Sequence, residues 1–187
     1  MVETRFQPAN SPAAARIPGL VPAWHVIGPF DAGESQLDAK FSPEREIDLD
    51  AVYDGKRGPV RWIVLPSVAG KTPIVDMHDR QLMAGTVSYA VCTVESDREQ
   101  EAQIGVAAAD AVVVWQDGRE VYRCPFGYWG HEVWEVWDRE RAPVMLPKGT
   151  SRFLVKLYNK RGPGAFIVLF RDSDGRPLDG LCFDPSR

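Results

Sequence analysis

The chain is short of the residue groups on which most catalytic and metal sites are built. Its 187 residues include 3 histidines and 3 cysteines, with no H-x-H, H-E-x-x-H or C-x-x-C spacing. Nothing in the sequence therefore places two imidazoles or two thiolates together to grip a transition metal. An odd number of cysteines, Cys92, Cys124 and Cys182, excludes a full disulfide framework and leaves one bridge at most.

Signs of a nucleophile are also missing. The sequence has no G-x-S-x-G motif, and no histidine lies beside a cysteine. Ala69-Gly70-Lys71-Thr72 resembles the end of a phosphate-binding loop, but Leu65 stands where that loop needs its first glycine. We therefore expect no catalytic activity, while noting that paired carboxylates can meet in a fold from distant positions.

Long apolar runs and an excess of positive charge are absent as well. No stretch reaches the roughly 20 apolar residues of a membrane helix, and residues 1–20 lack the apolar core of an export signal. The 22 Lys and Arg against 26 Asp and Glu give a net charge of −4, which offers no surface that neutralises phosphates. We expect a soluble protein with no membrane or nucleic-acid partner, and the compartment is left open.

Two acidic segments are candidate cation sites. Asp172 and Asp174 before Gly175 match the opening of a calcium loop, but its later acidic positions are missing. Asp76-Met77-His78-Asp79 offers three potential ligands in four residues, without a second imidazole nearby in sequence. No cofactor is expected, and a structural calcium held by carboxylates from separate segments stays open.

What the chain does contain is many short segments divided by turn residues. Its 16 glycines and 15 prolines leave little room for long helices. Residues 86–95 alternate between two faces as a β-strand does, and further strands are expected at residues 24–27, 60–65 and 153–158. Residues 43–50 are expected to hold one helical turn.

Two hairpins complete this picture. Residues 112–115 and 120–122 flank Asp117-Gly118, which suits a type I′ turn. Residues 166–171 and 177–182 flank Asp172-Ser173-Asp174-Gly175 in the same way. Short elements at this spacing predict an all-β fold, a two-sheet antiparallel jelly-roll β-sandwich over residues 21–187, preceded by a tail or linker at residues 1–20.

The most unusual segment, residues 125–137, carries five aromatic side chains. Flat rings stack on the apolar faces of sugars, and the same rings dominate protein interfaces. Inward packing of the segment as a strand or short helix is a third reading. Trp24, Trp62 and Trp115, within short apolar runs, are expected in the core.

Four stretches of the sequence carry a resemblance to a known family: Trp24-His25-Val26-Ile27-Gly28-Pro29-Phe30-Asp31, Tyr53-Asp54-Gly55-Lys56, Val114-Trp115-Gln116-Asp117-Gly118-Arg119 and Leu146-Pro147-Lys148-Gly149. They resemble galactose-binding-like jelly-roll modules, which often accompany secreted carbohydrate-active or multidomain bacterial proteins. Where that family often has paired aspartates before the hairpin, this chain has Ala108-Ala109-Asp110, and Asp-Gly replaces Asn-Gly at the tip.

The resemblance implies a non-catalytic module that recognises carbohydrate and an exported or cell-envelope context. The expected binding residues are Tyr128, Trp129 and Trp134 for stacking and His131, Glu132 and Asp110 for polar contacts. The alternative is an interaction or assembly module, in which the same aromatic segment docks another protein or a second copy of the chain.

Overall fold

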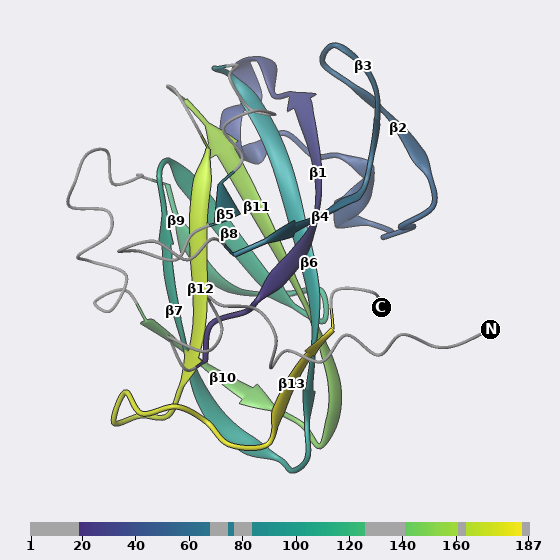
Figure 1. Cartoon of the computed structure of the whole chain (residues 1–187). Coiled ribbons are helices and arrows are strands. Elements are labelled where there is room, and N and C mark those ends of the chain that lie inside the picture. Colours follow the sequence, from purple (N-terminus) through teal and green to yellow (C-terminus); the bar gives the residue numbers. More distant parts are fainter. Residues whose placement is uncertain (1–18, 68–74, 77–83, 126–140, 161–163, 185–187) are drawn as a thin grey trace.

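The computed structural model describes residues 19–67, 75–76, 84–125, 141–160 and 164–184, which form layers of antiparallel strands (Figure 1). In chain order the elements are β1 (Ala23–Asp31), η2 (Gly33–Asp38), η3 (Ser42–Glu44), β2 (Val52–Gly55), β3 (Gly58–Arg61), β4 (Ile63–Pro66), β5 (Val75–Asp76), β6 (Thr86–Ser96), β7 (Gln100–Ala108), β8 (Ala111–Gln116), β9 (Arg119–Cys124), β10 (Arg141–Leu146), β11 (Gly149–Asn159), β12 (Ala165–Arg171) and β13 (Leu181–Asp184). Within these ranges the helical elements are the two short 3-10 segments η2 and η3. The expected all-β class is confirmed.

The strands divide into two main sheets. The larger sheet has the order β4-β1-β6-β11-β8-β9, with β13 also paired to β6, and the smaller sheet has the order β10-β7-β12-β5. From β6 to β13 the chain passes back and forth between these layers, and β8 to β9 is the one connection on that path that stays within a sheet. The predicted antiparallel jelly-roll sandwich is confirmed, and a two-stranded ribbon, β2-β3, is added to it.

The first predicted hairpin is present. Asp117 and Gly118 both have positive φ, 49° and 81°, as a type I′ turn requires. The ladder from β8 to β9 follows, pairing Gln116 with Arg119 and Val112 with Cys124.

The second predicted hairpin is wrong beyond its turn. The turn forms, since the Gly175 N–H donates to the Asp172 carbonyl at 3.0 Å, but one isolated bridge, Arg171 to Pro177, follows it. The neighbouring edge of β12 is already occupied by residues 19–21, where the Phe170 N–H donates to the Gly19 carbonyl at 2.8 Å. The returning chain therefore crosses to the larger sheet and pairs as β13 with β6.

Other expectations from the sequence hold in altered form. The strand expected at residues 60–65 is divided into β3 and β4, because Trp62 between them turns into the interior and is 7% exposed. The helical turn expected at residues 43–50 is η3, at the start of that range. The tail expected at residues 1–20 lies outside the described residues apart from Gly19 and Leu20, and Leu20 is buried.

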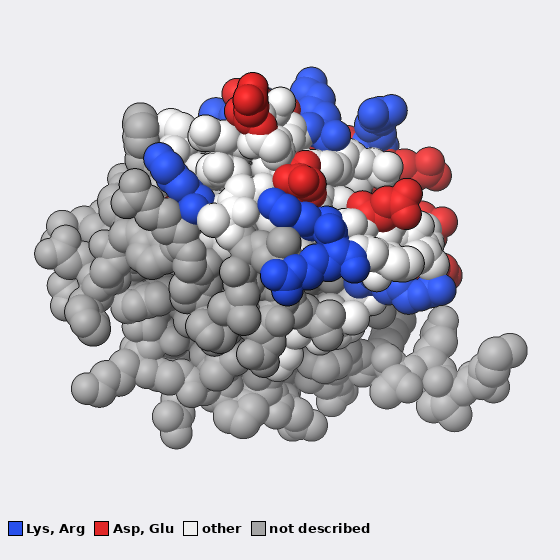
Figure 2. Space-filling view, turned by 90° about the horizontal axis from the view of Figure 1, so that it is seen from above, with Lys and Arg blue, Asp and Glu red and all other residues white. Residues whose placement is uncertain are grey.

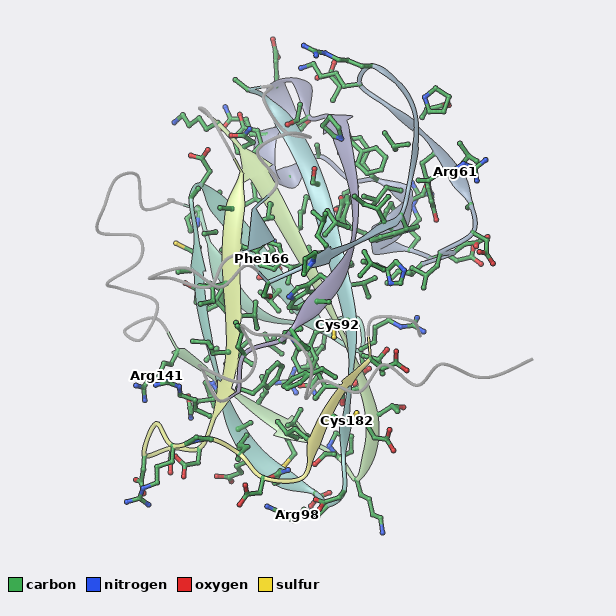
Figure 3. The ribbon with its side chains drawn as sticks, viewed as in Figure 1. Arg61, Cys92, Arg98, Arg141, Phe166 and Cys182 are labelled. Carbon is green, nitrogen blue, oxygen red and sulfur yellow. The ribbon has the colours of Figure 1, made fainter. Side chains whose placement is uncertain are left out.

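The first core fills the space between the two sheets. It receives alternate side chains of β6 and β11 from one layer and of β7 and β12 from the other. Its large rings meet edge to face, as Phe153 does with Phe170 at 4.9 Å and Trp24 with Phe166 at 5.3 Å. Phe166, labelled in Figure 3, is fully buried there.

A second core lies on the outer face of the larger sheet. There residues 32–62, which we call the cover, pack on side chains such as Val87, Tyr89 and Val113. Phe30 stacks on Phe41 of the cover with 4.8 Å between ring centroids. The cover includes η2, η3 and the β2-β3 ribbon, which bears Arg61, whereas the β6–β7 turn with Arg98 lies at the opposite end of the molecule (Figure 3).

One buried ion pair fixes the cover to the sheet. Lys156 of β11 has a side chain only 3% exposed, and its ammonium donates to the Glu44 carboxylate at 2.6 Å and to the Ala39 carbonyl at 2.5 Å. The Tyr89 hydroxyl also donates to Glu44. Burial, reinforced by this carboxylate, raises the pKa of Tyr89 far above its ordinary value, so the phenol stays a neutral donor.

None of the three cysteines forms a disulfide. Cys92 on β6 is buried in the first core, and burial raises the pKa of its thiol. Cys182 lies on β13 and is exposed (Figure 3). The one bridge that the sequence left open does not form.

The first core predicts the effect of a large cavity. Phe153 is fully buried against Phe170, so Phe153→Ala is expected to lower the free energy of unfolding by roughly 3–5 kcal/mol. Val52→Ala, at a side chain 47% exposed, is the control and should change it by less than about 0.5 kcal/mol. Urea unfolding followed by tryptophan fluorescence measures both, and equal effects would contradict this description of the core.

The ion pair predicts non-additive substitutions. Glu44→Gln leaves the Lys156 ammonium buried without its carboxylate and should cost roughly 3 kcal/mol, at the low end for buried pairs because 15% of the Glu44 side chain is exposed. Lys156→Met combined with Glu44→Gln should recover most of that loss, since no buried charge remains. Additive losses in the double variant would show that the two groups do not act together.

Candidate functional site

Most of the predicted binding residues fall on a segment that the structure leaves undescribed. Tyr128, Trp129, His131, Glu132 and Trp134 all lie outside the described residues, and their role stays a prediction. The segment that carries them, 126–140, joins β9 to β10, and these strands end the larger and the smaller sheet.

Asp110 is described, and its carboxylate has a structural contact. It is 8% exposed in the β7–β8 turn, and it accepts a hydrogen bond from the Lys160 backbone N–H at 2.8 Å. Because Val112 pairs with Cys124, Asp110 lies at the same end of the sheet as the start of the aromatic segment. Part of the acceptor capacity of Asp110 is already used by its contact with Lys160, and its role in binding stays a prediction.

The three tryptophans expected in the core divide into two kinds. Trp24 and Trp62 are buried, 1% and 7% exposed. Trp115 is only half-buried, packs against the rim of the second core and lines an open groove. The expectation is confirmed for the first two and too simple for the third.

This groove, of about 700 Å³, lies on the outer face of the larger sheet beside the cover. The cover contributes residues 43–47 to one wall, and the Asp117–Gly118 turn contributes to another. The sheet supplies the remaining lining residues, which are Thr93, Trp115, Thr150, Arg152 and Leu154.

Strand register explains how the sheet residues meet. Leu154 of β11 lies directly opposite Trp115 of β8, and Arg152 lies opposite Thr93 of β6. Arg152 and Trp115 are therefore diagonal neighbours on one face, a relation that places their Cα atoms about 7–8 Å apart. An indole, a guanidinium and a hydroxyl are thus presented together on the outer face of the sheet.

The carboxylates of the groove differ in their availability. Glu44 is engaged by Lys156 and Tyr89. Asp117 accepts the backbone N–H of Arg152 at 2.7 Å, and its own N–H donates to the Arg152 carbonyl at 2.9 Å. Glu46 is exposed on the wall, and no side-chain hydrogen bond or ion pair joins its carboxylate to another described residue.

Nearby cations on the same sheet face are neutralised. Lys156 is paired with Glu44. Arg123 of β9 donates two hydrogen bonds to Glu120 and lies 3.5 Å from Asp38, and the guanidinium lowers the pKa of the Glu120 carboxyl. Seen from one end of the molecule, Lys and Arg side chains lie beside Asp and Glu side chains over the described surface (Figure 2).

The predicted acidic loops are explained by local contacts. Asp172 accepts the Arg176 backbone N–H at 2.7 Å, and Asp174 pairs with the Arg176 guanidinium at 3.0 Å. No group of three or more His, Cys, Asp or Glu side chains arranged for a metal occurs in the described ranges. Of the segment 76–79, residues 77–79 lie outside the described ranges.

No helix among the described residues is long and apolar enough to cross a membrane.

The groove was not predicted from the sequence, because the strand that bears Trp115 has no polar face. β8 is apolar on both faces, since Val112 and Val114 enter the first core while Val113 and Trp115 face the second. When both faces of a strand are apolar, the alternation of its side chains does not show which face is partly exposed to solvent. Arg152 on the outer face of β11 is a charged residue that lines the groove, but Lys156 on the same face is charged and buried, so charge alone does not separate the open part of this face from the covered part.

Comparison with known proteins identifies no family for this chain. No family model matches it, and no curated protein matches it. Among solved structures, an anti-sigma factor domain-containing protein from Clostridium clariflavum is similar with a TM-score of 0.46 and 10% identity over 87% of this chain. The match covers 47% of that protein, so the chain spans about half its length.

Proposed function

We propose that this protein is a non-catalytic binding module that recognises carbohydrate. The observation that carries the proposal is the half-buried Trp115 ring in the open groove, with Arg152 as its diagonal neighbour. A flat indole packs on the apolar C–H face of a pyranose. The guanidinium of Arg152, the Thr150 hydroxyl and the Glu46 carboxylate would hydrogen-bond the sugar hydroxyls.

The groove's shape supports weak and reversible binding. It is open along the sheet, so a sugar chain can lie across it without a deep pocket having to form. Stacking with a few solvent-facing hydrogen bonds corresponds to dissociation constants on the order of micromolar to millimolar.

The carboxylates favour binding over cleavage. Glycosidic hydrolysis needs two carboxyl groups, one to donate a proton and one to act as base or nucleophile. In the groove, Glu44 is held by Lys156 and Tyr89, and Asp117 by the Arg152 backbone. Only Glu46 of the described acidic groups there has no such contact, and a single carboxylate does not make that pair.

We also propose that the sandwich is of the galactose-binding-like type, because of the motifs around Trp24, Tyr53 and Asp117 in its sequence. In that case the aromatic segment, with Tyr128, Trp129, His131, Glu132 and Trp134, is a second surface for ligand. The density of rings at residues 125–137 equally favours the alternative, an assembly module that docks a protein or a second copy of the chain.

Oligosaccharide titrations monitored by tryptophan fluorescence and calorimetry test the proposal. Wild-type protein is expected to bind at least one oligosaccharide of the panel, and Trp115→Ala to weaken that binding about tenfold by removing the stacking surface. Trp115→Phe, which keeps a flat ring, should retain part of the affinity. Thermal melts of each variant check that the fold is intact.

Two results would contradict it. Absence of any response to sugars, together with a mass that rises with protein concentration, would favour the assembly module. Binding that is lost in Trp129→Ala and unchanged in a folded Trp115→Ala would move the site from the groove to the aromatic segment.

A further inference from the structure

We infer that the groove prefers acidic oligosaccharides, those built from uronic acids, over neutral ones. This inference rests on the proposed function and adds the chemical class of the ligand. It comes from the charges left unpaired around Trp115.

Arg152 stands apart from the other cations that β9 and β11 present on this face. Lys156 and Arg123 are each engaged by a carboxylate at 2.6–2.8 Å. The guanidinium of Arg152 forms no hydrogen bond or ion pair with any described residue, although its backbone is fixed on both sides by Asp117. The backbone of Arg152 is thus fixed in the strand, and its planar guanidinium group remains available to a ligand.

A second arginine of the groove also has no carboxylate partner in the described part of the chain. Arg45 on the wall is exposed, and its guanidinium likewise has no carboxylate partner among the described residues. Glu46 and Asp117 keep their negative charges in the groove, and Glu44 is balanced by Lys156. Over its described residues the groove as a whole therefore has no positive excess, and the inferred preference rests on the guanidinium of Arg152 beside Trp115.

The spacing of Arg152 and Trp115 suits one sugar residue that carries a carboxylate. A pyranose stacked on the Trp115 ring would bring a carboxylate at its edge toward the diagonal neighbour, within reach of a long side chain. Guanidinium pairs with carboxylate through two parallel hydrogen bonds, which neutral hydroxymethyl groups cannot reproduce. Stacking on Trp115 is therefore available to neutral and acidic sugars alike, and the guanidinium of Arg152 favours the acidic sugar.

Calorimetric titration with two matched ligands tests the inference: an α-1,4-linked tetrasaccharide of galacturonic acid, and the same tetrasaccharide with its carboxyl groups reduced to hydroxymethyl groups. We expect the acidic ligand to bind about tenfold more tightly, and Arg152→Gln to abolish that preference. Arg152→Lys should keep only part of it, because a lysine lacks the fork. Arg176→Gln, an exposed arginine paired with Asp174 away from the groove, is the control and should bind as wild type does.

Salt gives an independent readout. Raising NaCl from about 0.1 M to about 1 M shortens the Debye length from roughly 10 Å to roughly 3 Å, so affinity for the acidic ligand should fall severalfold while that for the neutral ligand stays constant. Equal binding of both ligands, or a preference that survives Arg152→Gln, would overturn the inference and leave the proposed function standing. Failure of both ligands, and of every other sugar, to bind would overturn the proposed function itself.

Discussion

The attachment of the cover to the larger sheet determines which surface this protein can offer. Lys156 extends from β11 into the second core, and its charge is tolerated there because Glu44 and the Ala39 carbonyl meet it. Without that pair, an ammonium would point into an apolar interface. The pair thus places the wall formed by residues 43–47 at a defined position above the sheet, and the groove is the space beside that wall.

Because of this arrangement, the outer face of the larger sheet is buried at one end and partly exposed at the other. At the covered end both faces of β6 are buried, one in each core. At the wall, the outer residues of β6 and β11 change from Val91 and Leu154 to Thr93 and Arg152, and Leu154, Thr93 and Arg152 line the groove. A polar row directly next to an apolar row is a surface on which the apolar face and the polar edge of one sugar ring can each find a suitable contact.

Much of the fold could be predicted from the sequence because its signals are local. The Asp117–Gly118 turn and the alternation of residues 86–95 and 153–158 depend on backbone preferences and on period-two burial, and these elements are present as expected. The return of the chain after Asp172 could not be predicted, because its pairing depends on residues 19–21 occupying the edge of β12. The groove could not be predicted either, since it arises where the cover ends and both faces of β8 are apolar.

A two-dimensional nuclear magnetic resonance titration that follows the indole N–H signals of the six tryptophans tests the central claim most directly. With an acidic tetrasaccharide as ligand, the account predicts that the Trp115 signal shifts in a saturable way, while the buried Trp24 and Trp62 signals stay in place. A Trp115 signal that does not move when another tryptophan signal does would contradict the assignment of the groove as the sugar-binding surface.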